Sequence, residues 1–180
     1  MKQTAKNVSP NSNEGRNLYV VEHITAALLE LMESKPFGTI SISEICDKAG
    51  VGRASFYRNF ESKEDVISKH LKKLLDEWWI KEIVKPDFNL IEAIFEHYYK
   101  HRDLCIMLYK QGLAHLSLQS VKEACGPKPE HNNADAYFAA FCSYGLYGWI
   151  EEWFKRGMQE TPEEMSELWK RVQDKTLPNE

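Results

Sequence analysis

The sequence has few cysteines and no long apolar run, and both features restrict the class of protein. Its four cysteines, Cys46, Cys105, Cys125 and Cys142, are scattered and form no C-x-x-C pair. Residues 1–17 are polar and do not resemble a secretion signal. No segment approaches the roughly 20 consecutive apolar residues that a membrane-spanning helix needs. We therefore expect a cytoplasmic protein, with no membrane partner, whose cysteines are reduced thiols.

Sequence signatures of common enzyme classes are also missing. The chain has no glycine-rich phosphate loop, no G-x-S-x-G nucleophile motif and no H-E-x-x-H zinc motif. The glutamates of Glu151-Glu152 and Glu163-Glu164 are adjacent. On a helix, adjacent side chains point in different directions, so neither pair can act as acid and base together. We expect no enzymatic activity and no cofactor.

The composition is that of a folded globular protein. Of the 180 residues, 43% are hydrophobic and 12% are aromatic, which separates the chain from disordered sequences. The net charge is −4, and it lies in the C-terminal part, whereas the N-terminal third is slightly basic. This distribution does not suit a protein that coats nucleic acid, but it allows local contacts with phosphates.

Helix start and stop signals predict an all-α chain without strands. Apolar residues recur at three- and four-residue spacing, and capping residues, glycine or proline bound each segment. The predicted helices cover about 17–34, 42–49, 53–59, a long segment between Ser62 and Pro86, a segment from Asn89, two segments within 103–124, and then 133–157 and 162–175.

The order of these segments predicts two domains and a tail. We expect a flexible N-terminal tail over 1–16, a three-helix domain over 17–75 and a second helical domain over 76–180. The domain boundary lies inside a helix, and such a helix would couple the two domains mechanically.

Residues 39–66 carry the pattern of a helix-turn-helix. Two short helices flank Ala49-Gly50-Val51, and the second helix has small and polar residues on its outer side. Such a helix is a poor core element, but its backbone can approach a polyanion closely. The residues predicted to contact DNA are Ser41, Gly52, Arg53, Ala54, Ser55, Tyr57, Arg58, Asn59 and Lys63.

These residues are expected to make two kinds of contact. Arg53 and its polar neighbours on the second helix can reach base edges in a major groove. Arg58 and Lys63 would bind flanking phosphates, and Ser41 and Lys63 lie at helix N-termini, where backbone amides favour anions. The alternative from residue chemistry alone is a structural helical corner with an ordinary solvated face.

Residues 18–67 resemble the DNA-binding domain of TetR-type bacterial transcriptional regulators. The resemblance rests on Ile42-x-x-Ile45, on Ala49-Gly50-Val51, and on Ser55-Phe56-Tyr57-x-x-Phe60-x-Ser62-Lys63-Glu64-x-Val66. It implies a homodimer with two DNA-binding heads, residues 17–75 with a helix-turn-helix over 41–60, and a larger ligand-binding and dimerisation body, residues 76–180. The expected partner is double-stranded DNA with a pseudo-palindromic operator, and the expected role is that of a repressor with an unknown effector.

The C-terminal half resembles one subgroup of these regulators, which includes activators of dihydroxyacetone kinase genes. The resemblance rests on His101-Arg102-Asp103-Leu104, on Tyr147-Gly148-Trp149-Ile150-x-x-Trp153-x-x-Arg156-Gly157-Met158, and on Thr161-Pro162-Glu163-Glu164-Met165. It does not identify the ligand.

The aromatic residues of the C-terminal half are assigned to two sites. A helix over 133–157 that is apolar nearly all round has to be covered on more than one face. The predicted dimer interface consists of Gly145, Gly148, Trp149, Trp153, Met165 and Trp169. The predicted ligand pocket consists of Trp78, Phe95, Tyr98, Tyr99, Tyr109, Tyr137, Phe138, Phe141 and Tyr144. The alternatives are the central helix of a monomeric bundle for the first site and plain core for the second.

Two other functions stay open beside the main interpretation. His97, His101 and Cys105 have i, i+4, i+8 spacing, which on one continuous helix would suit a transition metal and a metal-responsive regulator. A helical protein-interaction protein with a degenerate head is the other. The main interpretation requires no metal.

Overall fold

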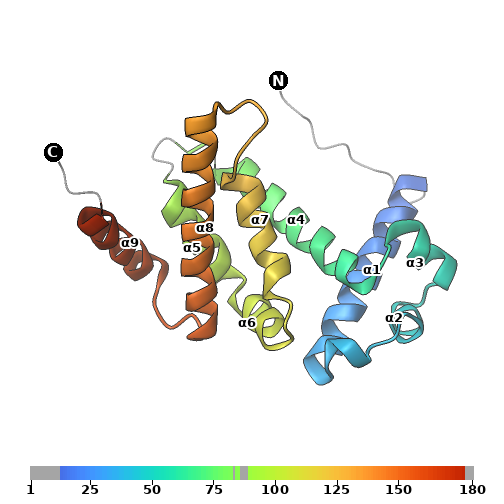
Figure 1. Ribbon diagram of the computed structural model, residues 1–180. Helices are drawn as coiled ribbons and strands as arrows, with labels where there is room; N and C mark the ends of the chain where they lie inside the picture. Colours follow the sequence, from blue (N-terminus) through green and yellow to red (C-terminus); the bar gives the residue numbers. More distant parts are fainter. Residues whose placement is uncertain (1–12, 83, 86–88, 177–180) are drawn as a thin grey trace. The chain divides into compact units, whose positions relative to one another are not determined.

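The computed structural model describes residues 13–82, 84–85 and 89–176, and it is helical throughout (Figure 1). These residues form nine α-helices and one 3-10 turn, Phe37–Thr39, with no strand among them. The predicted all-α class is therefore confirmed. None of the helices in the described ranges is long and apolar enough to cross a membrane.

The helix bounds follow the predicted segments closely. The helices are α1 (Asn13–Ser34), α2 (Ile42–Ala49), α3 (Arg53–Asn59), α4 (Lys63–Glu82), α5 (Leu90–Lys100), α6 (Arg102–Lys110), α7 (Ala114–Cys125), α8 (Asn133–Lys155) and α9 (Pro162–Thr176). Most of the predicted tail, 1–16, lies outside the described residues, but residues 13–16 are helical. The sequence pattern did not predict this first turn of α1, because a polar turn has no apolar periodicity.

The helix ends are set by the capping signals of the sequence. The side chains of Ser41, Asn89 and Thr161 each accept a hydrogen bond from a backbone N–H in the first turn of the helix that follows. Gly50 (φ 66°) ends α2 and Gly112 (φ 75°) separates α6 from α7, both in the left-handed conformation that favours glycine.

The chain forms two compact units, residues 1–70 and residues 71–180. Helix α4 begins in the first unit and continues into the second. These are units of packing, so the predicted functional domains, 17–75 and 76–180, stay a prediction.

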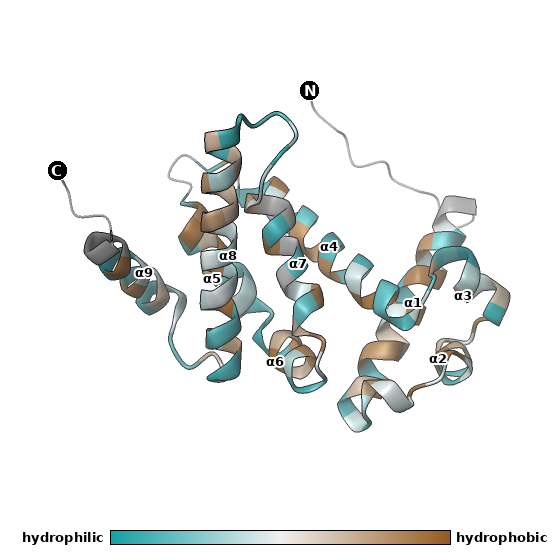
Figure 2. Ribbon diagram, viewed as in Figure 1, coloured by the Kyte–Doolittle hydropathy of each residue, from teal (hydrophilic) through white to brown (hydrophobic). Residues whose placement is uncertain are grey.

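Each unit has its own apolar core, and apolar and polar residues alternate around its helices (Figure 2). In the first unit, Leu28, Ile45 and Phe56 are fully buried, so α1, α2 and α3 share one core. In the second unit, the Phe95 ring meets Trp153 edge-on at 5.6 Å between centroids. These contacts join α5 to α8 inside the body.

Candidate nucleic-acid interface

The turn between α2 and α3 is short and tightly hydrogen-bonded. The N–H of Val51 donates to the Cys46 carbonyl at 3.0 Å, and Gly50 supplies the left-handed residue between them. Phe56 is fully buried on the inner side of α3 and lies 5.7 Å from the Phe60 ring. Because α3 is anchored through these aromatic residues, its other side faces outward.

The outward side of α3 carries the side chains predicted to contact DNA. Arg53, Ala54 and Arg58 are exposed, and Tyr57 keeps 53% of its surface. Ser55 is half-buried on the same short helix. The exposed face combines small residues with two guanidinium groups, which suits a helix that enters a groove.

The two arginines of α3 differ from several other basic residues of the first unit. In the described part of the chain, neither Arg53 nor Arg58 forms an ion pair or a hydrogen bond. Lys48 and Lys69, by contrast, bind carboxylates at 2.7 and 2.9 Å. Among the described residues, Arg53 and Arg58 therefore place unpaired positive charge on α3, where it can meet phosphates and base edges.

Gly52 precedes the first residue of α3, and the free chain does not require a glycine there. Its φ of −76° and ψ of 150° are open to any residue. A Cβ atom built on Gly52 has no described atom within 4 Å. A side chain at this position would therefore project into open space beside the exposed face of α3.

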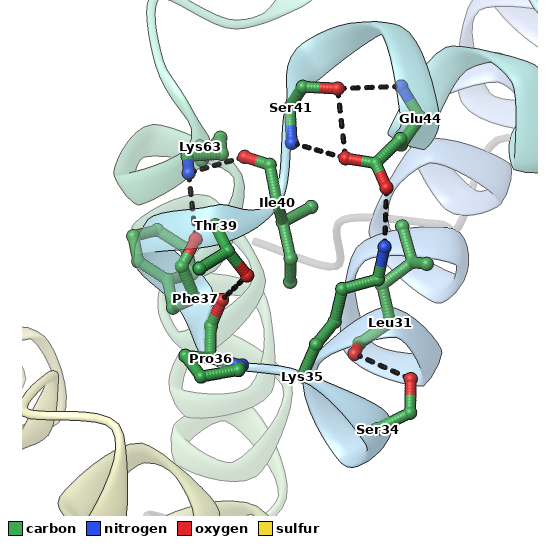
Figure 3. A network of polar contacts seen from close by, with 10 residues as sticks. All are labelled: Leu31, Ser34, Lys35, Pro36, Phe37, Thr39, Ile40, Ser41, Glu44 and Lys63. Atoms are coloured by element: carbon green, nitrogen blue, oxygen red, sulfur yellow. Dashed lines mark hydrogen bonds and ion pairs between the residues drawn. The ribbon is translucent and has the colours of Figure 1, made fainter.

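Ser41 forms a complete capping box with Glu44 (Figure 3). The Ser41 amide donates to the Glu44 carboxylate at 2.8 Å, and the Ser41 hydroxyl accepts from the Glu44 amide at 3.2 Å. Lys35 also donates to this carboxylate, and these hydrogen bonds lower the pKa of Glu44 to about 2. The Ser41 hydroxyl is therefore already engaged, and a phosphate at this helix end would have to use the next amides along α2.

Lys63 reaches back to the turn between α1 and α2 (Figure 3). Its ammonium donates to the carbonyls of Phe37 at 2.8 Å and Ile40 at 2.6 Å, and it lies 4.5 Å from the centre of the Phe37 ring. Two of its three N–H groups are thus used inside the protein, and a phosphate could engage the third. Sequence analysis missed this role because the two carbonyls lie 26 and 23 residues away along the chain.

Asn59 is likewise engaged at the end of α3. Its side-chain amide donates to the Ser55 carbonyl at 2.9 Å, which leaves its side-chain oxygen for other partners. The Lys69 ammonium donates to the Asn59 carbonyl at 2.8 Å and to the Asp65 carboxylate at 2.9 Å. Lys69 was not among the residues predicted to contact DNA. Its i, i+4 spacing from Asp65 is the sequence signal that indicates this ion pair.

In the second unit, the structure separates the residues of the predicted ligand pocket. Phe95 and Tyr98 belong to the buried core, while Trp78, Tyr99 and Tyr109 are half-buried around it. Four others lie on the outside of α8, where 60% to 78% of each side chain is exposed: Tyr137, Phe138, Phe141 and Tyr144. Within one chain, these nine residues therefore differ in their surroundings, because α8 turns one side to the core and the other to solvent.

The predicted dimer interface is divided in the same way. Trp153 and Met165 are only 2% and 4% exposed, so they have almost no surface left for a partner. Gly145 and Gly148 are exposed, and Trp149 packs edge-on against Trp169 at 5.4 Å. The large exposed apolar side chains of α8 are instead Tyr137, Phe138, Phe141 and Tyr144, which we call the α8 aromatic face.

The three residues of the metal alternative do not come together as one ligand set. The rings of His97 and His101 are 5.1 Å apart between centroids, but the buried Cys105 thiol donates to the Tyr98 carbonyl. Among the described residues, no group of three or more histidine, cysteine, aspartate or glutamate side chains could hold a metal ion.

An anchored helix pair with an exposed, basic second helix defines a helix-turn-helix protein. Comparison with protein-family models identifies the family of this helix-turn-helix protein. Residues 24–69 match the family described as bacterial regulatory proteins, tetR family, and residues 88–175 match a transcriptional regulator C-terminal region. The chain belongs to the TetR family of DNA-binding transcriptional regulators, as the sequence motifs predicted. A comparison with curated proteins gave no match.

Proposed function

We propose that the protein is a cytoplasmic, one-component repressor that binds a pseudo-palindromic operator as a homodimer. A small ligand bound by the body changes the spacing of the two heads and so releases the operator. The observation that carries the DNA-binding part is the exposed face of α3 with its unpaired Arg53 and Arg58. In a two-fold dimer, two such helices would meet successive major grooves roughly 34–36 Å apart, or a multiple of this distance.

The first test is a selection of random duplex DNA by the purified protein, followed by binding measurements at several salt concentrations. Arg58→Gln is expected to weaken binding to all sequences and to reduce the salt dependence by about one phosphate contact per subunit. Arg53→Gln is expected to change which sequence is preferred. Arg156→Gln is the matched control, because Arg156 lies at the end of α8 and pairs with Glu152. A selection that enriches no sequence would refute the operator proposal.

Dimerisation is supported by the α8 aromatic face. Isolated exposed apolar residues are common, but four large aromatic side chains on one helix make a patch that soluble monomers seldom leave open. Gly145 and Gly148 lie on the same helix, and no described atom lies within 4 Å of a Cβ built on either glycine. A second copy of this helix could therefore approach α8 closely.

Regulation by a ligand requires that the ligand and the operator prefer different head spacings. Helix α4 is a continuous element from Lys63 in the first unit to Glu82 in the second, so a shift of its C-terminal half could move a head. A coupling free energy of about 1–3 kcal/mol would change operator affinity roughly 5- to 150-fold. A reporter gene behind the selected operator tests the direction: a repressor lowers expression, and an activator would raise it.

A further inference from the structure

A pocket of about 170 Å³ lies in the second unit between the C-terminal half of α4 and the end of α5. Three ring systems form part of its wall: Trp78 from α4, His97 from α5, and His101, which ends α5. The ring centroids of Trp78 and His97 are 5.0 Å apart, and those of His97 and His101 are 5.1 Å apart. The wall therefore offers a continuous run of aromatic surface.

His97 is buried in this wall without a hydrogen-bond partner. Only 8% of its surface is exposed, and neither ring nitrogen forms a hydrogen bond to any described residue. The His97 ring nitrogens are not among the sealed, unpaired polar atoms of the described residues, so they are open to the pocket that the ring lines. A ligand in the pocket could therefore form a hydrogen bond with one of them.

Both histidines of the wall present neutral rings. Burial first, and then electrostatic repulsion from Lys100 and from His101 whenever it is protonated, lower the pKa of His97 to about 4. Burial and Lys100 also lower the pKa of His101. At neutral pH each ring therefore offers one N–H donor and one nitrogen acceptor, with no positive charge.

The charged residues that line the pocket are balanced. Glu77, Lys81, Glu96 and Lys100 are exposed, two of each sign. Glu82, which also lines the pocket, is paired with Lys85 at 2.5 Å. A charged ligand would lose its hydration beside the neutral rings and would find no unpaired buried counterion there.

We propose that this pocket binds an uncharged, monocyclic aromatic molecule that carries at least one hydrogen-bonding group, as a phenol does. The ring would pack against Trp78, and the hydroxyl would pair with a ring nitrogen of His97. The volume suits one ring, since an engineered apolar cavity of about 150 Å³ holds benzene. The role of this pocket as the effector site of the regulator rests on the proposed function, whereas the binding of such a molecule does not.

The decisive experiment titrates the full-length protein with phenol and follows the imidazole Cε1–H resonances by NMR. Saturable shifts of the His97 and His101 signals are expected, with a dissociation constant of about 1 mM or tighter. Benzoate tests the exclusion of charge, and cyclohexanol tests the need for an aromatic ring; both are expected to bind at least about tenfold more weakly.

Variants locate the site. His97→Phe keeps an aromatic ring but removes both nitrogens, and it is expected to weaken phenol binding about 3- to 10-fold. His115→Phe is the matched control, because His115 is exposed on α7 and does not line the pocket. If His97→Phe does not fold, the shifts of the His97 and His101 signals in the wild-type titration decide whether phenol binds in this pocket.

The outcomes separate this inference from the proposed function. The binding site is overturned if neither histidine signal shifts saturably up to about 10 mM phenol, ten times the expected dissociation constant. Operator binding is measured on the same preparation. Binding of phenol without a change in operator affinity would support the site and overturn its effector role. Binding of phenol by a protein that recognises no operator would support the site and refute the proposed repressor.

Discussion

At the residue scale, Gly52 offers a way to separate folding from DNA binding. Serine is at least as good as glycine before the first residue of a helix, and the space around Gly52 is open. Gly52→Ser is therefore expected to leave the free energy of unfolding unchanged or to raise it by a few tenths of a kcal/mol. Operator affinity is expected to fall, because the new side chain would project into the space that DNA backbone needs.

Thermal unfolding and fluorescence anisotropy with operator DNA measure the two effects. Gly38→Ser is the control, since Gly38 also has no described atom within 4 Å of a built Cβ but lies outside α2 and α3. Equal operator affinity of wild type and Gly52→Ser would show that DNA does not approach this position.

Glu44 connects the capping box to the pH dependence of folding. Its pKa falls from 4.5 to about 2, first through the hydrogen bond from Lys35 and then through that from the Ser41 amide. Because the folded-state pKa is lower than the unfolded one, this stabilisation is complete above about pH 4.5 and is lost as pH falls towards 2. Glu44→Gln keeps a side chain suited to the capping box but has no charge to titrate.

The measurement is the thermal unfolding midpoint of both proteins between pH 2 and pH 6. The wild type is expected to lose stability more steeply than Glu44→Gln below about pH 4.5. Parallel curves would show that the ionised Glu44 contributes nothing to the folded state.

At the element scale, Lys63 ties the first turn of α4 to the turn before α2. Lys63→Met removes an ammonium that two backbone carbonyls accept from, at 2.8 and 2.6 Å. Carbonyls that lose a partner in a partly buried place cost about 1–3 kcal/mol, which is the expected loss in the free energy of unfolding. Operator binding should weaken for all sequences, because α4 would then hold the helix-turn-helix less firmly.

Chemical denaturation measures the stability of this variant. Lys72→Met is the control, because Lys72 pairs on the surface of the same helix with Asp76 at 2.8 Å, and such pairs contribute about 0.3–0.5 kcal/mol. A Lys63→Met protein as stable as wild type would show that Lys63 does not stabilise the fold, and phosphate binding would then be its only proposed role.

Helix α8 shows what an amphipathic pattern can and cannot predict. Its start after Asn132 and its end near Lys155 follow the capping and composition signals. Which apolar side chains face the core was not predictable, because aromatic residues occur nearly all round the helix. The structure buries Leu146, Ile150 and Trp153 and exposes the α8 aromatic face.

At the scale of the whole molecule, the α8 aromatic face predicts a dimer that one charge can disrupt. Phe141 is 78% exposed in the single chain. If a second copy covers it, Phe141→Glu would bury an unpaired charge and weaken the dimer by about 2 kcal/mol or more, roughly 30-fold. Light scattering with size-exclusion chromatography measures the mass across a dilution series.

The control for this prediction is Leu18→Glu, which changes an exposed apolar residue of α1. It is expected to leave the mass unchanged at every concentration. A wild-type protein that is monomeric throughout, or a Phe141→Glu protein that stays dimeric, would exclude this face as the interface.

The sequence by itself determined the helices, their caps and the family. These features depend on residues within a few positions of one another: the Ser41–Glu44 box, the left-handed Gly50 and the i, i+3, i+4 apolar spacing are all local. The helix-turn-helix motif is equally local, which is why the order of residues alone identifies the family and predicts which residues of α3 contact DNA.

Only the tertiary structure decided the rest. The carbonyl partners of Lys63 lie 26 and 23 residues away, and the pocket wall joins Trp78 of α4 to His97 of α5. Whether an aromatic residue is core or surface depends on which neighbouring helix covers it, as with the buried Trp153 and the exposed Phe141. Such contacts arise from packing between distant segments, and no local pattern records them.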